Sequence, residues 1–371
     1  MKLLYFKKIG LFFLSIIILN TSLFAQRSTI DSAKKILLKQ QQFEDSNLRT
    51  SFFIADEYMD VEQYDSAQIW LNKIYEKLPA KKPSLFNYFL ITRQAEVYYY
   101  NDLQQLGLQE SFKGLQMAQT LNDSFLIADS YNFLGLFYMN LDSSEAAIPY
   151  YKNGLSYTKQ PPYPTTYFTL SKPHHLYGNL SEAFYKIGMY DSALSNSLLS
   201  LQKAYKINSG RGIAVGHNST GDIFLAMHKY DSALYHYQKS KLAALQSEDI
   251  DVELICNGGL AKAYYELGDF TKSTQQLNDG FAILNNYPNL NRYYSLLFIA
   301  SAIKIYKNRN DYAALAKSLE IKSNLESENL KNNNIQLKTI LNAGVENEKR
   351  LLSLQVTEAR QKQKLANTGL V

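Results

Sequence analysis

The chain has 371 residues, more than the roughly 250–300 at which one hydrophobic core stops growing, so it must contain several domains or a repeat array. Charged residues make up 20%, and the formal net charge of +5 includes three lysines close to the N-terminus, so the remainder is too balanced in charge to indicate nucleic-acid binding. Only 17 Gly and 8 Pro are present, which argues against the many tight turns of an all-β fold, and a single cysteine excludes an intrachain disulfide.

The N-terminal segment has the layout of a secretory signal. Three lysines precede a short apolar run, Ile9–Leu19, and cleavage is expected after Ala25. The run is too short to cross a bilayer of ~30 Å as a helix. We therefore predict a signal peptide at residues 1–25 and a periplasmic or secreted mature protein, with an uncleaved membrane anchor as the alternative.

An aromatic ring recurs at nearly constant spacing along most of the chain. The consecutive spacings in the sequence are 40, 40, 46, 40, 40 and 42. Small residues recur three positions before and nine positions after most of these rings, which indicates a repeated packing unit. The rings, called the ring column below, are Tyr58, Tyr98, Tyr138, Phe184, Phe224, Tyr264 and Tyr306.

The triplet Asp-Ser-Ala occurs four times, mostly a short distance after a ring of the column. The copies begin at Asp31, Asp65, Asp191 and Asp231. Because an Asp side chain accepts hydrogen bonds from the free N–H groups of a first helical turn, each triplet predicts the start of a second helix after a short turn. Gly188 and Gly268 lie in that turn, where a residue free to adopt positive φ is useful.

One unit carries a fuller pattern of large and small residues at helical spacing. These residues are Tyr131, Leu134, Gly135 and Tyr138 in a first helix and Ala147, Tyr151 and Gly154 in a second. The pattern resembles the signature of the tetratricopeptide repeat. The resemblance implies an all-α, right-handed α-solenoid of antiparallel helix pairs over residues 28–325, in about seven units. The period found here is longer than the usual period of that family, about 34 residues, and so predicts longer helices or longer links.

Residues 160–173 interrupt the repeat. They contain four of the eight prolines, which block helix continuation and stiffen an extended chain. We therefore predict a long loop near the middle of the array, which is either an insertion without a role or a segment that contacts a partner.

Residues 326–371 are expected to form a long, charged amphipathic helix. Its leucines approach a coiled-coil heptad pattern that Gly344 and Glu358 interrupt. A basic helix of this kind is either solvated or able to meet a membrane surface. The order of signal, repeat array and charged helix is similar to the sensory regions of membrane-bound histidine kinases and helix-turn-helix regulators. We therefore interpret this helix as a linker truncated before a membrane span.

No spacing typical of a catalytic, nucleotide-binding or metal-binding motif occurs, so we predict no enzyme, no cofactor and no metal. Cys256 lies among apolar residues and is expected to be a buried structural residue. His228 and His236 flank a repeat turn and are expected at the surface. The histidines are His174, His175, His217, His228 and His236.

The resemblance also implies a peptide groove, because in such arrays the inner face is built mainly from the first helix of each pair. Three rows of that helix, at one position after and two and six before the ring, supply aromatic, Met, Asn and charged side chains. Several of these side chains could instead only pack between units. The predicted groove consists of Tyr99, Asn132, Met139, Glu182, Tyr185, Asn218, Asp222 and Tyr265.

The charges of the second row change sign along the array, from acidic residues toward the N-terminal end to lysines toward the C-terminal end. This favours a partner with basic character at one end. The function that the sequence favours is an exported protein- or peptide-binding scaffold, in the form of the sensory part of a truncated signal-transduction protein with a membrane-bound partner. The alternative is a free-standing assembly or chaperone-like factor of the cell envelope.

Overall fold

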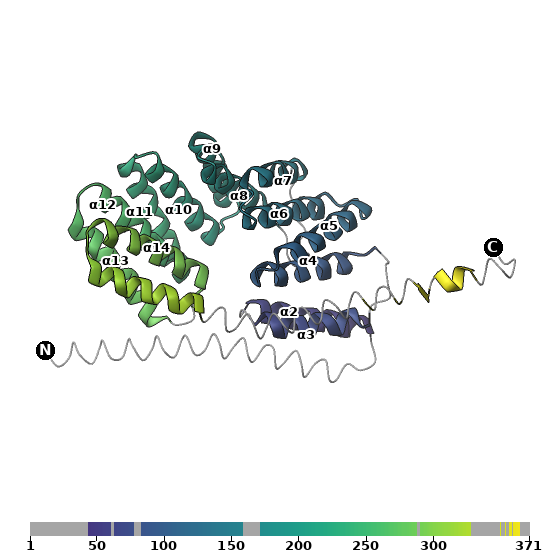
Figure 1. Cartoon of the computed structure of the whole chain (residues 1–371). Helices are drawn as coiled ribbons and strands as arrows, with labels where there is room; N and C mark the ends of the chain where they lie inside the picture. Colours follow the sequence, from purple (N-terminus) through teal and green to yellow (C-terminus); the bar gives the residue numbers. More distant parts are fainter. Residues whose placement is uncertain are drawn as a thin grey trace. The chain divides into compact units, whose positions relative to one another are not determined.

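The computed structural model contains only α-helices among the regular elements of the residues that it describes (Figure 1). This confirms the predicted all-α fold. The predicted signal peptide, most of the proline-rich loop and most of the C-terminal helix lie outside the described residues. The described residues are 44–60, 63–77, 83–158, 171–287, 290–327, 349, 353, 356–357 and 359–363.

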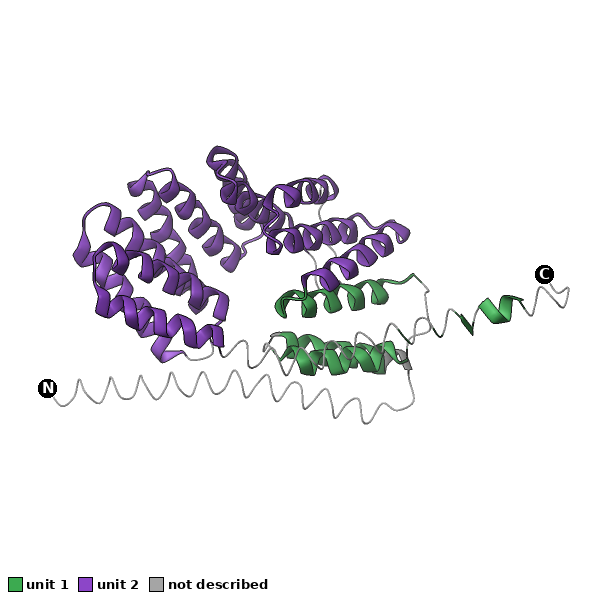
Figure 2. Cartoon of the chain, viewed as in Figure 1, with its two compact units in different colours: residues 1–103, 333–371 green, residues 104–332 purple. Residues whose placement is uncertain are grey.

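The chain divides into two compact units (Figure 2). One comprises residues 1–103 and 333–371, and the other comprises residues 104–332. The described helices of the first unit are α2 (Glu44–Asp60), α3 (Tyr64–Tyr75) and α4 (Leu85–Tyr100).

The second unit contains the longer run of helices. They are α5 (Gln104–Thr120), α6 (Ser124–Asn140), α7 (Ser144–Tyr157), α8 (Pro173–Lys186), α9 (Tyr190–Lys206), α10 (Gly210–Ala226), α11 (Tyr230–Gln246), α12 (Ile250–Glu266), α13 (Phe270–Asn286), α14 (Arg292–Asn308) and a last helix over residues 312–327. We call α6, α8, α10, α12 and α14 the A helices, and the helix that follows each of them a B helix. Each A helix packs on its own B helix and on the neighbouring A helices, so the A helices form a continuous layer.

Long helices explain the long period. The six helices from α9 to α14 each have 17 residues, and most of their connections are three-residue turns. Two such helices with two such turns make one period of the ring column. The longest spacing, between Tyr138 and Phe184, arises between the end of α7 and the start of α8, where the proline-rich segment lies.

The same turn closes each hairpin, and the ring column sets its position. The carbonyl of each ring residue accepts a hydrogen bond from the N–H group five positions later, for example from Lys229 to Phe224 at 2.9 Å. The residue between them in the left-handed conformation is glycine at Gly188 and Gly268, with φ of 78° and 79°. Both glycines therefore occupy the positive-φ position that the sequence predicts, and His228 occupies it without glycine at φ 58°. This is the Schellman arrangement of a helix C-terminus.

The Asp-Ser-Ala triplets that the structure describes lie one position deeper in their helices than capping requires, and the triplet at Asp31 lies outside the described residues. Helices α3, α9 and α11 begin at a tyrosine, so the aspartate is their second residue, and their N-cap residues make no side-chain capping bond. The prediction that these aspartates cap the helices is therefore wrong. A carboxylate in the first turn still interacts favourably with the helix dipole. Helix α13 has no such triplet, and there Asp269 is the N-cap residue and accepts from the N–H group of Lys272 at 3.0 Å.

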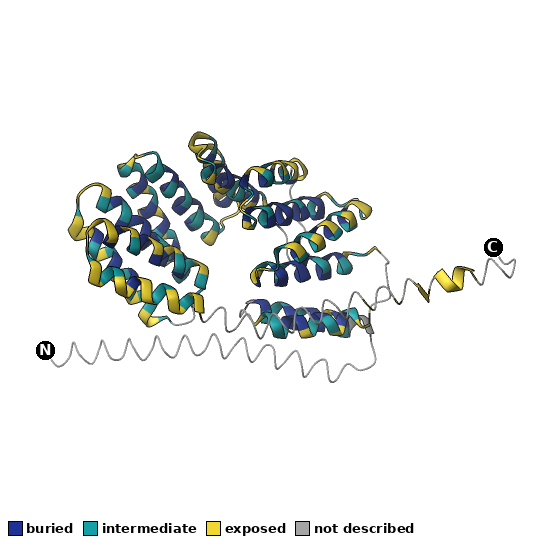
Figure 3. Cartoon of the chain, viewed as in Figure 1, coloured by how far each residue is buried: buried dark blue, intermediate teal, exposed yellow. Residues whose placement is uncertain are grey.

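The core is built by aromatic rings that lie on glycines of a neighbouring helix. The Tyr151 ring of α7 covers Gly135 of α6, and the Tyr237 ring of α11 lies between Gly221 of α10 and Gly259 of α12. Both tyrosines are completely buried. Figure 3 shows buried residues along the helix contacts and exposed ones at many of the turns. Cys256 is also completely buried, as predicted.

We expect Gly259→Ala to lower the free energy of unfolding by about 1–3 kcal/mol, because a methyl group at this position would overlap the Tyr237 ring. Urea unfolding followed by circular dichroism measures the change. The matched control is Gly178→Ala in α8, where the added methyl group meets only the hydroxyl of Ser200 at 3.3 Å. That variant should change stability by less than about 1 kcal/mol, since alanine is also the better helix former. Equal losses in the two variants would contradict the ring-on-glycine account.

Candidate functional site

Two of the predicted groove residues belong to the core. Met139 is 6% exposed and packs in a hydrophobic cluster with Ala147 and Leu180. Asn132 is 5% exposed, and its amide group donates to the Ser171 hydroxyl at 2.9 Å and accepts from Asn179 at 2.9 Å. These two side chains therefore hold repeats together, which is the alternative role that the sequence left open.

The Asn132 contacts are part of a buried polar junction. Asp129, only 1% exposed, accepts hydrogen bonds from both the backbone N–H and the hydroxyl of Ser171, at 2.7 and 2.6 Å. Ser171 lies shortly before α8, so this junction fixes the re-entry of the chain after the proline-rich segment onto α6. The repeat pattern gave no signal for Asp129, because its partner arises from the irregular spacing.

The other predicted residues remain at or near the surface of helices. Tyr99 is half-buried on α4 in the first unit. Tyr265 on α12 is half-buried against the ring of Phe270, with the ring centroids 5.5 Å apart. Glu182 on α8 is half-exposed at its side chain and lies 3.8 Å from the Lys186 ammonium.

Three successive A helices bring the remaining predicted residues together in one polar cluster. Asp222 of α10 accepts a hydrogen bond from the Tyr237 hydroxyl at 2.7 Å, forms an ion pair with Lys262 of α12 at 3.3 Å, and accepts from the Asn218 amide at 3.2 Å. Tyr185 of α8 is close enough for the Asp222 charge to affect its ionisation. We call Tyr185, Asn218, Asp222, Tyr237 and Lys262 the Asp222 cluster.

Burial and the Asp222 carboxylate both favour the protonated form of the tyrosine hydroxyls in this cluster. Burial, followed by the Asp222 carboxylate, raises the pKa of Tyr185 to about 12 and that of Tyr237 well above its usual value. Both phenols therefore remain protonated at neutral pH, and Tyr237 serves as a donor. Lys262 balances the negative charge of the carboxylate.

One polar atom of the cluster has no partner within the protein. The carboxamide oxygen of Asn218 is buried and accepts no hydrogen bond, and the residue is 8% exposed. A buried acceptor left unsatisfied costs about 1–3 kcal/mol. The cluster therefore holds an unsatisfied acceptor on Asn218, a residue that contacts Asp222, the partner of the Lys262 ammonium. An N–H group such as that of a peptide is the kind of donor that would satisfy it.

The acidic residues of the second predicted row are largely neutralised within the protein. Asp56 and Glu96 form ion pairs with the buried Arg93 in the first unit, and Asp222 pairs with Lys262 in the second. Little free negative charge is left at these positions to select a partner. The hypothesis of a partner with basic character therefore loses its main support.

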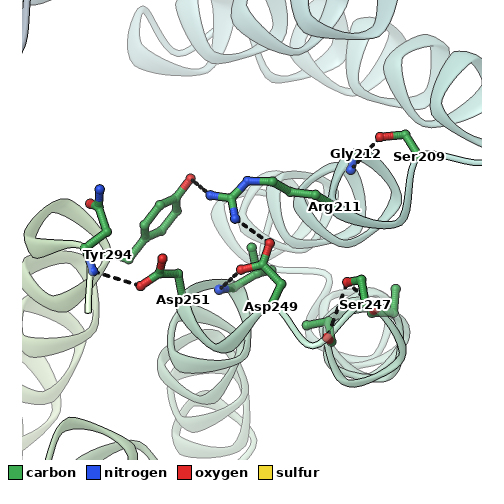
Figure 4. A network of polar contacts seen from close by, with 11 residues as sticks. Ser209, Arg211, Gly212, Ser247, Asp249, Asp251 and Tyr294 are labelled. Atoms are coloured by element: carbon green, nitrogen blue, oxygen red, sulfur yellow. Dashed lines mark hydrogen bonds and ion pairs between the residues drawn. The ribbon is translucent and has the colours of Figure 1, made fainter. Parts of the chain in front are cut away.

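A second polar network joins the beginnings of three A helices (Figure 4). Arg211 near the start of α10 pairs with Asp249, the N-cap residue of α12, and donates to the Tyr294 hydroxyl of α14 at 2.9 Å. Asp251 accepts from the backbone N–H of Asn291 at 3.0 Å. These groups satisfy one another, so the network serves to hold the ends of the layer in register.

Two pockets lie on the side of the B helices, away from the predicted groove residues. They have volumes of about 490 and 300 Å³ and occupy equivalent positions in consecutive repeats. Each is lined by a ring of the column and by the Asp-Ser pair of a triplet. The residues are Lys152, Leu180, Phe184, Asp191, Ser192, Ser195 and Asn196 in the first, and Phe224, Asp231, Ser232, Tyr235 and His236 in the second.

The histidines differ in environment. His228 is largely exposed, as predicted, whereas His236 is half-buried because its ring packs 5.3 Å from that of Phe224. His174 is 4% exposed, and neither of its ring nitrogens has a hydrogen-bond partner. Within the described residues, no group of three or more His, Cys, Asp or Glu side chains is arranged to hold a metal ion, and no helix is long and apolar enough to cross a bilayer.

The comparison with protein families decides the nature of the repeat. Residues 128–161, which contain most of α6 and all of α7, match the sequence model of the tetratricopeptide repeat. The chain is built from tetratricopeptide-like repeats. A search of curated proteins gives no match.

Solved structures share this tetratricopeptide-like fold. A Rap protein complexed with Competence and Sporulation Factor has a TM-score of 0.61 at 12% identity, over 90% of this chain and 93% of that chain. The Rap conjugation gene regulator of plasmid pLS20, in complex with the Phr* peptide, has a TM-score of 0.57 at 13% identity, over 76% of this chain and 75% of that chain. A signal transduction ATPase with a tetratricopeptide repeat sensor, from Pyrococcus horikoshii, has a TM-score of 0.54 at 19% identity, over 71% of this chain and 40% of that chain.

We expect His174 to make the protein less stable as the pH falls from about 6.5 to about 4. Burial, followed by the positive charge of Lys172, lowers the pKa of His174 to about 4, against about 6.5 in an unfolded chain. In this window the unfolded chain binds a proton that the folded chain does not, so the free energy of unfolding decreases, by an amount on the order of 2–3 kcal/mol from this group.

Urea unfolding at several pH values between 7.5 and 4.5 measures this dependence. The variant His174→Gln cannot bind the proton and should show a smaller decrease than the unaltered protein. The variant His228→Gln, at a largely exposed position, should keep the original slope. A slope unchanged in His174→Gln would show that this side chain is not the buried neutral group described here.

Proposed function

We propose that this protein is an exported scaffold that binds a peptide or an extended protein segment along the layer of A helices. The observation that carries the proposal is the Asp222 cluster, in which side chains of α10, α11 and α12 meet at the Asp222 carboxylate and the Asn218 oxygen is left unsatisfied. A peptide backbone supplies both donors and acceptors, so it satisfies this oxygen while its C=O groups accept from Lys262.

The layer of A helices suits an extended ligand because equivalent positions repeat along it. Side chains one repeat apart, such as Asp222 and Lys262, come within 3.3 Å of each other on adjacent A helices. A ligand that crosses the layer therefore meets a similar set of positions on each helix. Half-buried aromatic side chains, Tyr185 on α8 and Tyr265 on α12, provide apolar contact on the same layer.

Proteins of similar fold support the assignment of a peptide ligand and a sensory role. One Rap structure contains the Phr* peptide, and the archaeal ATPase has a tetratricopeptide repeat sensor. Together with the signal-like N-terminus, this favours a protein outside the cytoplasm whose ligand binding is relayed to a signal-transduction partner in the membrane.

The peptide-binding proposal predicts that Asn218→Ala weakens binding by about 10-fold, which is the value of one hydrogen bond to a buried acceptor. Suitable peptides can be captured by the protein from a digest of cell-envelope proteins and labelled with a fluorophore. Fluorescence anisotropy then gives the dissociation constant for each variant.

The matched control for Asn218→Ala is Tyr235→Ala, an exposed residue that lines a pocket on the B-helix side. It should leave the dissociation constant unchanged. The opposite result, weaker peptide binding in Tyr235→Ala and unchanged binding in Asn218→Ala, would place the binding surface at the pockets on the B-helix side and reject the site on the A helices.

Export predicts that the mature protein begins at Gln26. After expression of the whole chain in a Gram-negative host, mass spectrometry of the periplasmic fraction should find a form that lacks the segment 1–25. Ala25→Arg should block processing, because signal peptidases require a small residue at that position. Recovery of the unprocessed chain from the cytosol would contradict the export proposal.

A further inference from the structure

Three polar rings lie in a row across three consecutive helices. The Tyr205 hydroxyl at the end of α9 lies 2.9 Å from Nε2 of His217 on α10, and Nδ1 of His217 lies 3.0 Å from Nδ1 of His236 on α11. His217 is 6% exposed, His236 is half-buried, and Tyr205 is 55% exposed. Neither the groove along the A helices nor the repeat signature accounts for this arrangement.

Only one hydrogen fits between the two Nδ1 atoms. At 3.0 Å one nitrogen must donate and the other must accept, so a proton on both would place two N–H groups against each other. Two nitrogen lone pairs facing one another across such a gap are also the arrangement from which a metal ion is bound. In a tetrahedral zinc site with Zn–N bonds of about 2.0–2.1 Å, two ligand nitrogens are about 3.3 Å apart.

We propose that His217 and His236 bind a divalent transition metal ion of the zinc or copper type through their Nδ1 atoms. Imidazole nitrogen is a preferred ligand for these ions. Metal binding needs both rings as Nε2–H tautomers. The ring that carries its hydrogen on Nδ1 in the metal-free protein must therefore carry it on Nε2 instead, and no net proton is released. The two Nδ1 atoms need to separate by only a few tenths of an ångström, and each ring must also turn so that its lone pair points to the ion and not to the other ring.

Tyr205 is placed to support such a site. A histidine that binds a metal through one nitrogen commonly donates its other N–H to an oxygen atom, which orients the ring and fixes its tautomer. Here the Nε2–H of His217 would donate to the Tyr205 hydroxyl at 2.9 Å. Tyr205 is therefore a positioning residue and not a ligand.

The surroundings favour neutral rings. Burial, followed by His236 and then Lys239, lowers the pKa of His217 to about 4, and burial lowers the pKa of His236. Both rings are thus available as ligands at neutral pH, without competition from protons. His236 also lines the pocket of about 300 Å³, together with Asp231.

Calorimetric titration of the whole chain with zinc chloride, in a buffer that does not bind zinc, tests the proposal. We expect a site that His236→Gln removes, with the stoichiometry falling by one ion per chain or the affinity falling at least 10-fold. Tyr205→Phe should weaken the same site by about 10-fold, because it removes the acceptor that orients His217. Zinc should also raise the thermal midpoint of the unaltered protein and not that of His236→Gln.

Two control variants separate this site from the other histidines. His228→Gln removes a largely exposed histidine that contacts a tyrosine but no second imidazole, and His175→Gln alters the other adjacent pair, His174 and His175. Both should retain the affinity of the unaltered chain. Absence of zinc binding up to millimolar concentration, or binding that persists unchanged in His236→Gln, would overturn the proposal.

Discussion

The contact of a large aromatic ring with a glycine on the next helix is the interaction on which the second unit depends. Phe137, Tyr151, Tyr237 and Phe298 are all completely buried, and each covers a helical glycine that leaves no space for a methyl group. Such pairs let helices approach closely while each ring removes a large apolar area from water. Because Tyr237 lies between glycines of two A helices, one side chain joins consecutive repeats, and the register of the array follows from it.

The regular part of the fold could be predicted because its causes are local and repeated. The ring column marks the last turn of each A helix, and glycine at two turns marks the left-handed residue. The start of the B helices was predicted to within one position, but the capping role of the triplet aspartates was not, since a single step along the chain decides whether a carboxylate faces the free N–H groups. The period itself also could not reveal that every helix from α9 to α14 has 17 residues.

The candidate site was only partly predictable, because equivalent positions in a repeat have different neighbours. Asn132 and Asn218 occupy the same position before the ring. The side-chain NH2 of Asn132 donates to Ser171 and its oxygen accepts from Asn179, whereas the oxygen of Asn218 is unsatisfied. The irregular segment before α8 supplies one partner in the first case. His217 and His236 lie on different helices, and they come into contact only when α10 and α11 pack as a hairpin.

The identical hairpin turn has a consequence for how such a chain can change length. Each residue added to a helix rotates the side chains that follow it by about 100° around the helix axis. A single inserted residue within an A helix would therefore turn the later residues of that helix out of phase with the rings and glycines of its neighbours, whereas duplication of a complete two-helix module would keep each ring opposite its partner. The extra length between the third and fourth rings falls outside the helices, where it does not alter this angular phase. Evolution of this chain is thus constrained to whole modules, with insertions tolerated at the joints between them.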